Sequence, residues 1–227
     1  RLQQHILDFG FGSRTGVPLP GEVSGIVHDV KNWSKVTIAQ IPMGQGIAVT
    51  RMQMMMAMSA IANKGELMRP MLVDRLEDAQ GRLVAKYVPQ RVRQVIDAET
   101  AAAMVQALKT VPTPEGTAPR AAMTRYTVAG KTGTAQKAGP GGYMPGKYVA
   151  SFIGFLPADQ PDLCIGIFFD EPRNGHYGGV VAGPVFKRGA ERAAAYLGVP
   201  PDTPAEELAT SPVSATRMNA SALARRE

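Results

Sequence analysis

The stretch of sequence that decides the fold is Val128-Ala129-Gly130-Lys131-Thr132-Gly133-Thr134-Ala135-Gln136-Lys137. Residues 126–128 begin the predicted strand, because their aromatic and β-branched side chains are typical of a β-strand. The strand then narrows to alanine and glycine, whose small size lets a ligand or another backbone come close. Lys131 and Thr132 add a cation and a hydroxyl to this narrow part. We therefore predict a strand that binds an extended peptide ending in a carboxylate.

The tripeptide Lys-Thr-Gly at residues 131–133 is a signature of penicillin-binding proteins and class A β-lactamases. Taken alone it also fits a strand with a solvated lysine and a turn at Gly133. The whole ten-residue run is far more specific. It closely resembles the third active-site motif of class B penicillin-binding proteins, the peptidoglycan transpeptidases.

Further blocks of the chain resemble the same family, in the same order. They are the Phe-Gly-Phe-Gly string that opens residues 9–25, the Gly-Gln-Gly block within residues 44–70, Gly116-Thr117-Ala118, and Tyr177-Gly178-Gly179. The resemblance covers most of residues 2–197. It implies a mixed α/β (α+β) fold of the penicillin-binding/serine β-lactamase-like transpeptidase type, with an antiparallel sheet flanked by helices and incomplete at its N-terminus. Residues 1–197 are predicted to be the C-terminal part of that domain, and residues 198–227 a disordered tail.

Local patterns predict most of the elements directly. Helices are expected at 2–9, from an N-cap at Thr50 to about Gly65, from an N-cap at Asp97 to 109, and in the later part of 180–197. The second helix is expected to bury a stripe formed by Met52, Met55, Met56, Ser59, Ala60 and Asn63. A hairpin is expected at 71–76 and 83–88, and an antiparallel pair at 148–156 and 163–169, whereas 137–147 is expected to be a mobile loop.

Composition limits the classes of function. The 227 residues are 44% hydrophobic and 19% charged, which predicts a folded domain, and the formal charge of +6 suits an anionic partner. No Lys/Arg cluster is interleaved with aromatics, so we predict no nucleic-acid partner. His5, His28 and His176 have no metal-ligand spacing and Cys164 is the single cysteine, so no metal, cofactor or internal disulfide is expected.

Two motifs of the family are missing from the sequence. Transpeptidases of this kind use a Ser-x-x-Lys nucleophile motif and a Ser-x-Asn motif. Neither pattern occurs at any serine, namely Ser13, Ser24, Ser34, Ser59, Ser151, Ser211, Ser214 and Ser221. The expectation is that the nucleophile lies outside this chain and that the chain alone is inactive. No apolar run is long enough to span a membrane, so an anchor to the inner membrane, with the domain facing the periplasm, would also lie elsewhere.

The resemblance assigns roles to four residues. Lys131 and Thr132 would hold the terminal carboxylate of a D-Ala-D-Ala stem peptide or of a β-lactam. Gly133 would let the substrate backbone lie against the strand, and the backbone amide of Thr134 would be one of two oxyanion donors. The implied function is a serine D,D-transpeptidase that cross-links peptidoglycan during cell division, with membrane proteins of the division machinery as partners.

Alternatives remain open at this point. One is another enzyme of the same fold, a β-lactamase or a carboxypeptidase, although the block at 44–70 favours a class B transpeptidase. Another is a non-catalytic module that recognises peptides or binds the divisome. The blocks at residues 9–12 and 44–46 favour a division-type transpeptidase over an elongation-type one. Asp170, Glu171 and Arg173 are expected to form a solvated turn.

Overall fold

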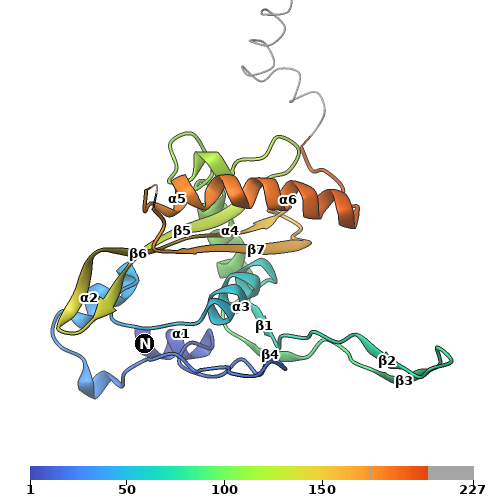
Figure 1. Cartoon of the computed structure of the whole chain (residues 1–227), viewed down its shortest axis with the longest axis horizontal. Coiled ribbons are helices and arrows are strands. Elements are labelled where there is room, and N and C mark those ends of the chain that lie inside the picture. Colours follow the sequence, from blue (N-terminus) through green and yellow to red (C-terminus); the bar gives the residue numbers. More distant parts are fainter. Residues whose placement is uncertain (174, 204–227) are drawn as a thin grey trace, which may run out of the picture.

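A three-stranded antiparallel sheet forms the centre of the molecule (Figure 1). The structure is a computed structural model that describes residues 1–173 and 175–203. The strands are β5 (Ala129–Gly139), β6 (Gly142–Leu156) and β7 (Leu163–Asp170), in the order β5-β6-β7. Among the described strands, β5 therefore lies at an edge of this sheet.

Helices cover both faces of the sheet. One face packs against α5 (Gly178–Val181) and α6 (Gly183–Leu197), the other against α3 (Arg51–Ala62) and α4 (Ala98–Lys109). Because side chains alternate along a strand, Phe152 of β6 points to α6 and meets Phe186 edge-on at 4.7 Å, while Ile153 points to the opposite cluster. The fold is the predicted mixture of helices and antiparallel sheet.

The rest of the described chain forms smaller elements around this core. Helix α1 (Leu2–Asp8) starts the chain, and β1 (Glu66–Met68) pairs with β4 (Arg91–Gln94). A hairpin of β2 (Arg75–Glu77) and β3 (Leu83–Lys86) projects from the body as an arm (Figure 1). The short helices are η1 (Val30–Asn32), α2 (Thr37–Gln40), η2 (Ile41–Met43) and η3 (Pro119–Ala121).

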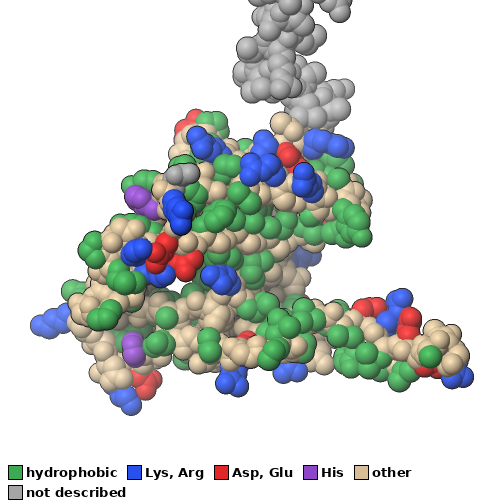
Figure 2. Space-filling view, in the orientation of Figure 1, with side chains coloured by type: hydrophobic (Ala, Val, Ile, Leu, Met, Phe, Trp, Pro, Cys, Tyr) green, Lys and Arg blue, Asp and Glu red, His purple; other side chains and the backbone are tan. Residues whose placement is uncertain are grey.

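The projecting arm carries exposed apolar side chains. Figure 2 shows them along β2 and β3, where Leu76, Leu83 and Val84 are all exposed. No helix of the described residues is long and apolar enough to cross a lipid bilayer.

Helix α3 begins at the predicted cap. The side chain of Thr50 accepts a hydrogen bond from Gln53 N at 3.1 Å, and Gln53 Oε1 accepts one from Thr50 N at 2.8 Å. This reciprocal pair is a capping box. The Gln53 side chain is only 1% exposed, and its Nε2 donates to Ser13 O at 2.7 Å and Ser24 O at 2.8 Å. Gln53 thus fixes the long loop after α1 to the start of α3.

We expect Gln53→Leu to lower the free energy of unfolding by about 2 kcal/mol, because the carbonyl groups of Ser13 and Ser24 lose the donor that the buried Gln53 side chain provides. Chemical denaturation monitored by circular dichroism measures the change. The matched control is Gln106→Leu, at an exposed position of α4, which should change stability little. Equal stabilities of the two variants would contradict this role for Gln53.

The local structure differs from the prediction in three places. Residues 137–147 are not a loop: β5 and β6 continue as one long hairpin, and Ala138 still pairs with Tyr143. Strands β1 and β4 were not predicted. The expected stripe on α3 was only partly right, because Gln53, Met58 and Ala60 are its buried residues. Helix α3 lies between the sheet and β1, so it has neighbours on more than one side.

Residues that follow α6 return to the start of β5. Tyr126 Oη donates a hydrogen bond to Val199 O at 2.8 Å, and Thr127 N donates to Asp202 Oδ1 at 2.7 Å. Val199 is buried in the same core as Phe186. The remainder of the tail predicted to be disordered, residues 204–227, lies outside the described residues.

Candidate substrate-binding site

The predicted site residues lie together on the edge strand β5. Lys131 pairs with Ile153 of β6, Thr132 with Phe152 and Gly133 with Ser151. Lys131 is exposed, and its Nζ donates to Thr132 O at 2.9 Å and to Thr132 Oγ1 at 3.4 Å. The ammonium group therefore lies along β5 beside both the hydroxyl and a backbone carbonyl.

Backbone groups of alternate residues point to the same edge of an antiparallel strand. Since Thr132 O accepts from the side chain of Lys131, we infer that this carbonyl faces the unpaired edge. The N–H of Thr134, two residues on, then faces the same edge. An amide, a cation and a hydroxyl placed in this way suit a ligand that carries an oxyanion and a carboxylate.

The hydroxyl groups of β5 are held from the α5/α6 side of the sheet. Thr132 Oγ1 lies 3.1 Å from Thr117 Oγ1, in the loop before η3. Thr134 Oγ1 accepts a hydrogen bond from Gly178 N at 3.1 Å, at the start of α5. The sequence pattern singled out Gly116-Thr117-Ala118 but gave Thr117 no role, because nothing local indicates a contact fifteen residues away.

Glycines allow α5 to lie directly on the sheet. A Cβ on Gly178 would overlap the carbonyl oxygens of Ser151 and Gly133, and one on Gly179 would overlap that of Thr117. These two glycines therefore serve the close packing of α5 against the sheet and against the loop that carries Thr117. Gly133 is also restricted from within the sheet, because its Cβ would overlap Ser151 Oγ.

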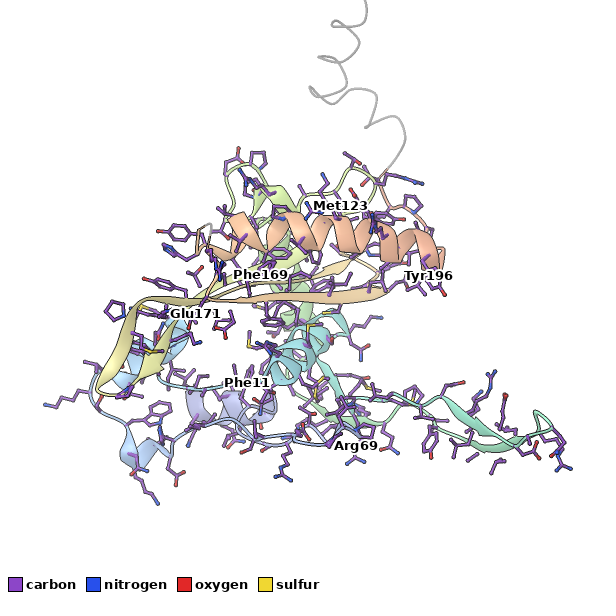
Figure 3. All side chains as sticks on the ribbon, viewed as in Figure 1. Phe11, Arg69, Met123, Phe169, Glu171 and Tyr196 are labelled. Carbon is purple, nitrogen blue, oxygen red and sulfur yellow. The ribbon has the colours of Figure 1, made fainter. Side chains whose placement is uncertain are left out.

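An ion-pair cluster joins the far part of the β5–β6 hairpin to the end of β7. Lys137 Nζ lies 2.9 Å from both Asp170 Oδ1 and Glu171 Oε1, and Lys147 pairs with Glu171 as well. Figure 3 shows Glu171 at this junction. The turn was expected to be merely solvated, and this was wrong: its two carboxylates connect three segments. Hydrogen bonds lower the pKa of Glu171 to about 2, and the one from Lys147 contributes more than the one from Lys137.

We expect Glu171→Gln to lower the melting temperature at neutral pH and the difference from wild type to disappear in acid. The pKa of Glu171 is lower in the folded protein, so its contribution is present above the ordinary carboxyl pKa of 4.5 and lost as pH falls through about 2. Melting curves from neutral pH downwards check this. Added salt should reduce the difference.

The control for Glu171 is Glu115→Gln, whose carboxylate forms no ion pair with any described residue. A Glu171→Gln difference that persists unchanged below a pH of about 2 would show that its effect is not ionic.

Three aromatic rings stack beside the ion-pair cluster. His176 lies between Tyr148 and Tyr177, with ring centroids 4.4 Å apart on each side. Tyr148 pairs with Gln136 of β5, and Tyr177 directly precedes the glycines of α5. The stack therefore fixes the segment that carries Gly178.

No lysine is hydrogen-bonded to a serine hydroxyl in the part of the chain that the structure describes. Where a lysine ammonium group there has a partner, the partner is a carboxylate or Thr132. No group of three or more His, Cys, Asp or Glu side chains among the same residues could hold a metal ion. The site as described can bind and orient a ligand.

Comparison with protein families gives a match over most of the chain. The family described as penicillin binding protein transpeptidase domain matches residues 1–191. Stage V sporulation protein D of Bacillus subtilis is 38% identical over 203 residues, 88% of this chain and 31% of that protein. The probable peptidoglycan D,D-transpeptidase PenA of Neisseria flavescens is 34% identical over 204 residues, 89% of this chain and 48% of that protein. This chain thus spans less than half the length of these curated relatives.

Solved structures give the same result. Penicillin binding protein 3 of Mycobacterium tuberculosis in its apo form is 35% identical, with a TM-score of 0.79 over 88% of this chain and 47% of that one. The same protein has been solved in complex with ampicillin, at 34% identity and a TM-score of 0.79, over 89% of this chain and 47% of that one. The transpeptidase domain of Burkholderia pseudomallei penicillin-binding protein 3 is 36% identical, with a TM-score of 0.77 over 88% of this chain and 58% of that one.

Proposed function

Because this chain belongs to the penicillin-binding protein transpeptidase family, we propose that the full-length protein is a D,D-transpeptidase that cross-links peptidoglycan stem peptides. The observation that carries the proposal is the unpaired edge of β5. Lys131 and Thr132 lie side by side on it, 3.4 Å apart from Nζ to Oγ1. In this proposal they bind the terminal carboxylate of a D-Ala-D-Ala peptide, or that of a β-lactam that mimics it.

The reaction proceeds through an acyl-enzyme. A serine hydroxyl attacks the carbonyl carbon of the penultimate D-Ala, its proton passes to the leaving amine, and the C–N bond breaks to release the terminal D-Ala. An amine of a second stem peptide then attacks the ester, forms the cross-link and returns the proton to the serine. Gly133 leaves room for the substrate backbone. The amide of Thr134 stabilises the oxyanion, and such a donor contributes on the order of 100- to 1,000-fold in rate.

The nucleophilic serine is proposed to lie outside these 227 residues. Two facts support this: the sequence holds no Ser-x-x-Lys or Ser-x-Asn motif, and the chain spans only 31% and 48% of two relatives. The proposed location is the inner membrane, with this domain facing the periplasm and the division machinery as partner. The sequence blocks at residues 9–12 and 44–46, which resemble division-type transpeptidases, support the division machinery as the partner.

A fluorescent-penicillin gel of native membranes, probed in parallel with an antibody to this segment, tests the proposal. We expect one band well above 24.2 kDa, the mass of this chain, that carries both label and antibody. A labelled band at the mass of this chain would place the nucleophile within it. A band that binds antibody but takes no label would favour a non-catalytic peptide-recognition module. Rapid release of the label would indicate a β-lactamase.

A further inference from the structure

We propose that Thr117 is a positioning residue that makes the Thr132 hydroxyl a donor toward the ligand carboxylate. The inference rests on the proposed function, since it concerns how the same edge of β5 recognises its ligand. Thr117 belongs to the loop before η3, and its side chain reaches the site, with 3.1 Å between the two Oγ1 atoms.

The argument begins with the hydrogen-bonding capacity of Thr132. A hydroxyl group donates one hydrogen bond and accepts two. A lysine ammonium can only donate, so the contact of Lys131 Nζ with Thr132 Oγ1 at 3.4 Å makes Oγ1 an acceptor. The contact with Thr117 can run in either direction, because both partners are hydroxyl groups.

A bound carboxylate removes this freedom. A carboxylate can only accept, so Thr132 must turn its single hydrogen toward the ligand. Thr132 can then no longer donate to Thr117, and the contact persists only if Thr117 donates to Thr132. In that arrangement Thr132 accepts from Lys131 and Thr117 and donates to the ligand, so its capacity is completely used.

The loop holds Thr117 in place for this role. Ala118 is fully buried, and its N–H donates to Val111 O at 2.9 Å. Gly116 has no room for a Cβ, which would overlap the carbonyl oxygens of Thr110 and Val111. On the other side, Gly179 of α5 packs against the carbonyl of Thr117. The Thr117 hydroxyl is thus positioned before the ligand arrives, which limits the entropy lost on binding.

The test compares Thr117→Val with Thr117→Ser in the full-length protein, using acylation by a fluorescent penicillin. Valine has the shape of threonine without the hydroxyl, and serine keeps the hydroxyl. We expect Thr117→Val to weaken the apparent affinity for the penicillin about five- to tenfold, the effect of losing one hydrogen bond between two neutral hydroxyl groups. The maximal acylation rate should change little. Thr117→Ser should behave like wild type.

Two controls separate positioning from folding. Thr113→Val removes a hydroxyl from the same loop, whose bond to Thr110 O does not involve β5, and it should leave acylation unchanged. The methyl ester of the same penicillin lacks the carboxylate, so its acylation should be weaker. That weaker acylation should be the same in wild type and in Thr117→Val, because the ester gives Thr132 no charged acceptor.

Each outcome decides something. If Thr117→Val and Thr117→Ser weaken acylation equally, the inference is overturned and Thr117 has a packing role. The same holds if Thr117→Val weakens acylation by the penicillin and by its methyl ester equally. If Lys131→Ala weakens acylation but Thr117→Val does not, the inference alone is wrong. If Lys131→Ala has no effect either, the proposed carboxylate site itself is wrong, and the inference with it.

Discussion

Replacing Lys131 with alanine in the full-length protein is expected to lower the second-order rate constant for acylation by penicillin about 10- to 100-fold. The physical reason is the loss of a charge-assisted hydrogen bond, worth about 1.5–3 kcal/mol when one partner is ionised. Lys131 is exposed, and its ammonium group donates only to its neighbour Thr132 among the described residues, so the fold should not depend on it. The time course of label incorporation, at several penicillin concentrations, gives the constant.

The matched control for Lys131 is Lys86→Ala. It also removes one positive charge, but from an exposed position on the β2–β3 arm. It should leave acylation and melting temperature unchanged. Acylation kinetics that are the same for Lys131→Ala and wild type would refute the carboxylate-binding role of Lys131.

The second large effect is expected for Gly178→Ala, which should lower the free energy of unfolding by about 3 kcal/mol or more. A methyl group there would overlap two backbone carbonyl oxygens, those of Ser151 and Gly133. Backbone in a paired strand cannot move aside as a flexible side chain can. Helix α5 must therefore shift away from β5, and Thr134 Oγ1 loses its donor, Gly178 N. Thermal unfolding measures the loss of stability.

Another glycine in the next helix provides the control. A Cβ on Gly189, in the middle of α6, would meet nothing within 4 Å. Gly189→Ala should raise stability by about 0.5–1 kcal/mol, because alanine loses less conformational entropy in a helix. If both variants were destabilised alike, the close approach of Gly178 to the sheet would not be the cause.

Elements with strong local signals were predicted well. The β6–β7 pair, the caps at Thr50 and Asp97 and the β2–β3 hairpin are all present. The missed strands β1 and β4 have three and four residues, and each depends on the other for its hydrogen bonds. The extension of the β5–β6 hairpin was hidden by its glycines and prolines. Ion pairs of Lys137 and Lys147 with residues at and after the end of β7 support it.

The same difference between local and long-range signals applies to the site. The cation and hydroxyl of Lys131 and Thr132 are adjacent in sequence, so their proximity on one strand was predictable. Thr117 comes from the loop before η3 and Gly178 from the start of α5, 15 and 44 residues from their partners. Such contacts follow from tertiary packing, and the sequence offered only a family resemblance at those positions. Gln53 was missed because a glutamine at the third position of a helix ordinarily serves the cap alone.

The contacts of Val199 and Asp202 give the chain after α6 a role in holding the start of β5. They join residues that are 73 and 75 positions apart, and so close this part of the chain into a ring. Closing a ring of that size costs about 4 kcal/mol of chain entropy, which the buried core within it must outweigh. A chain cut after Leu197, where the sequence pattern suggests the domain ends, would lack both contacts. The segment that leads to Lys131 would then lose two of the contacts that hold it in place.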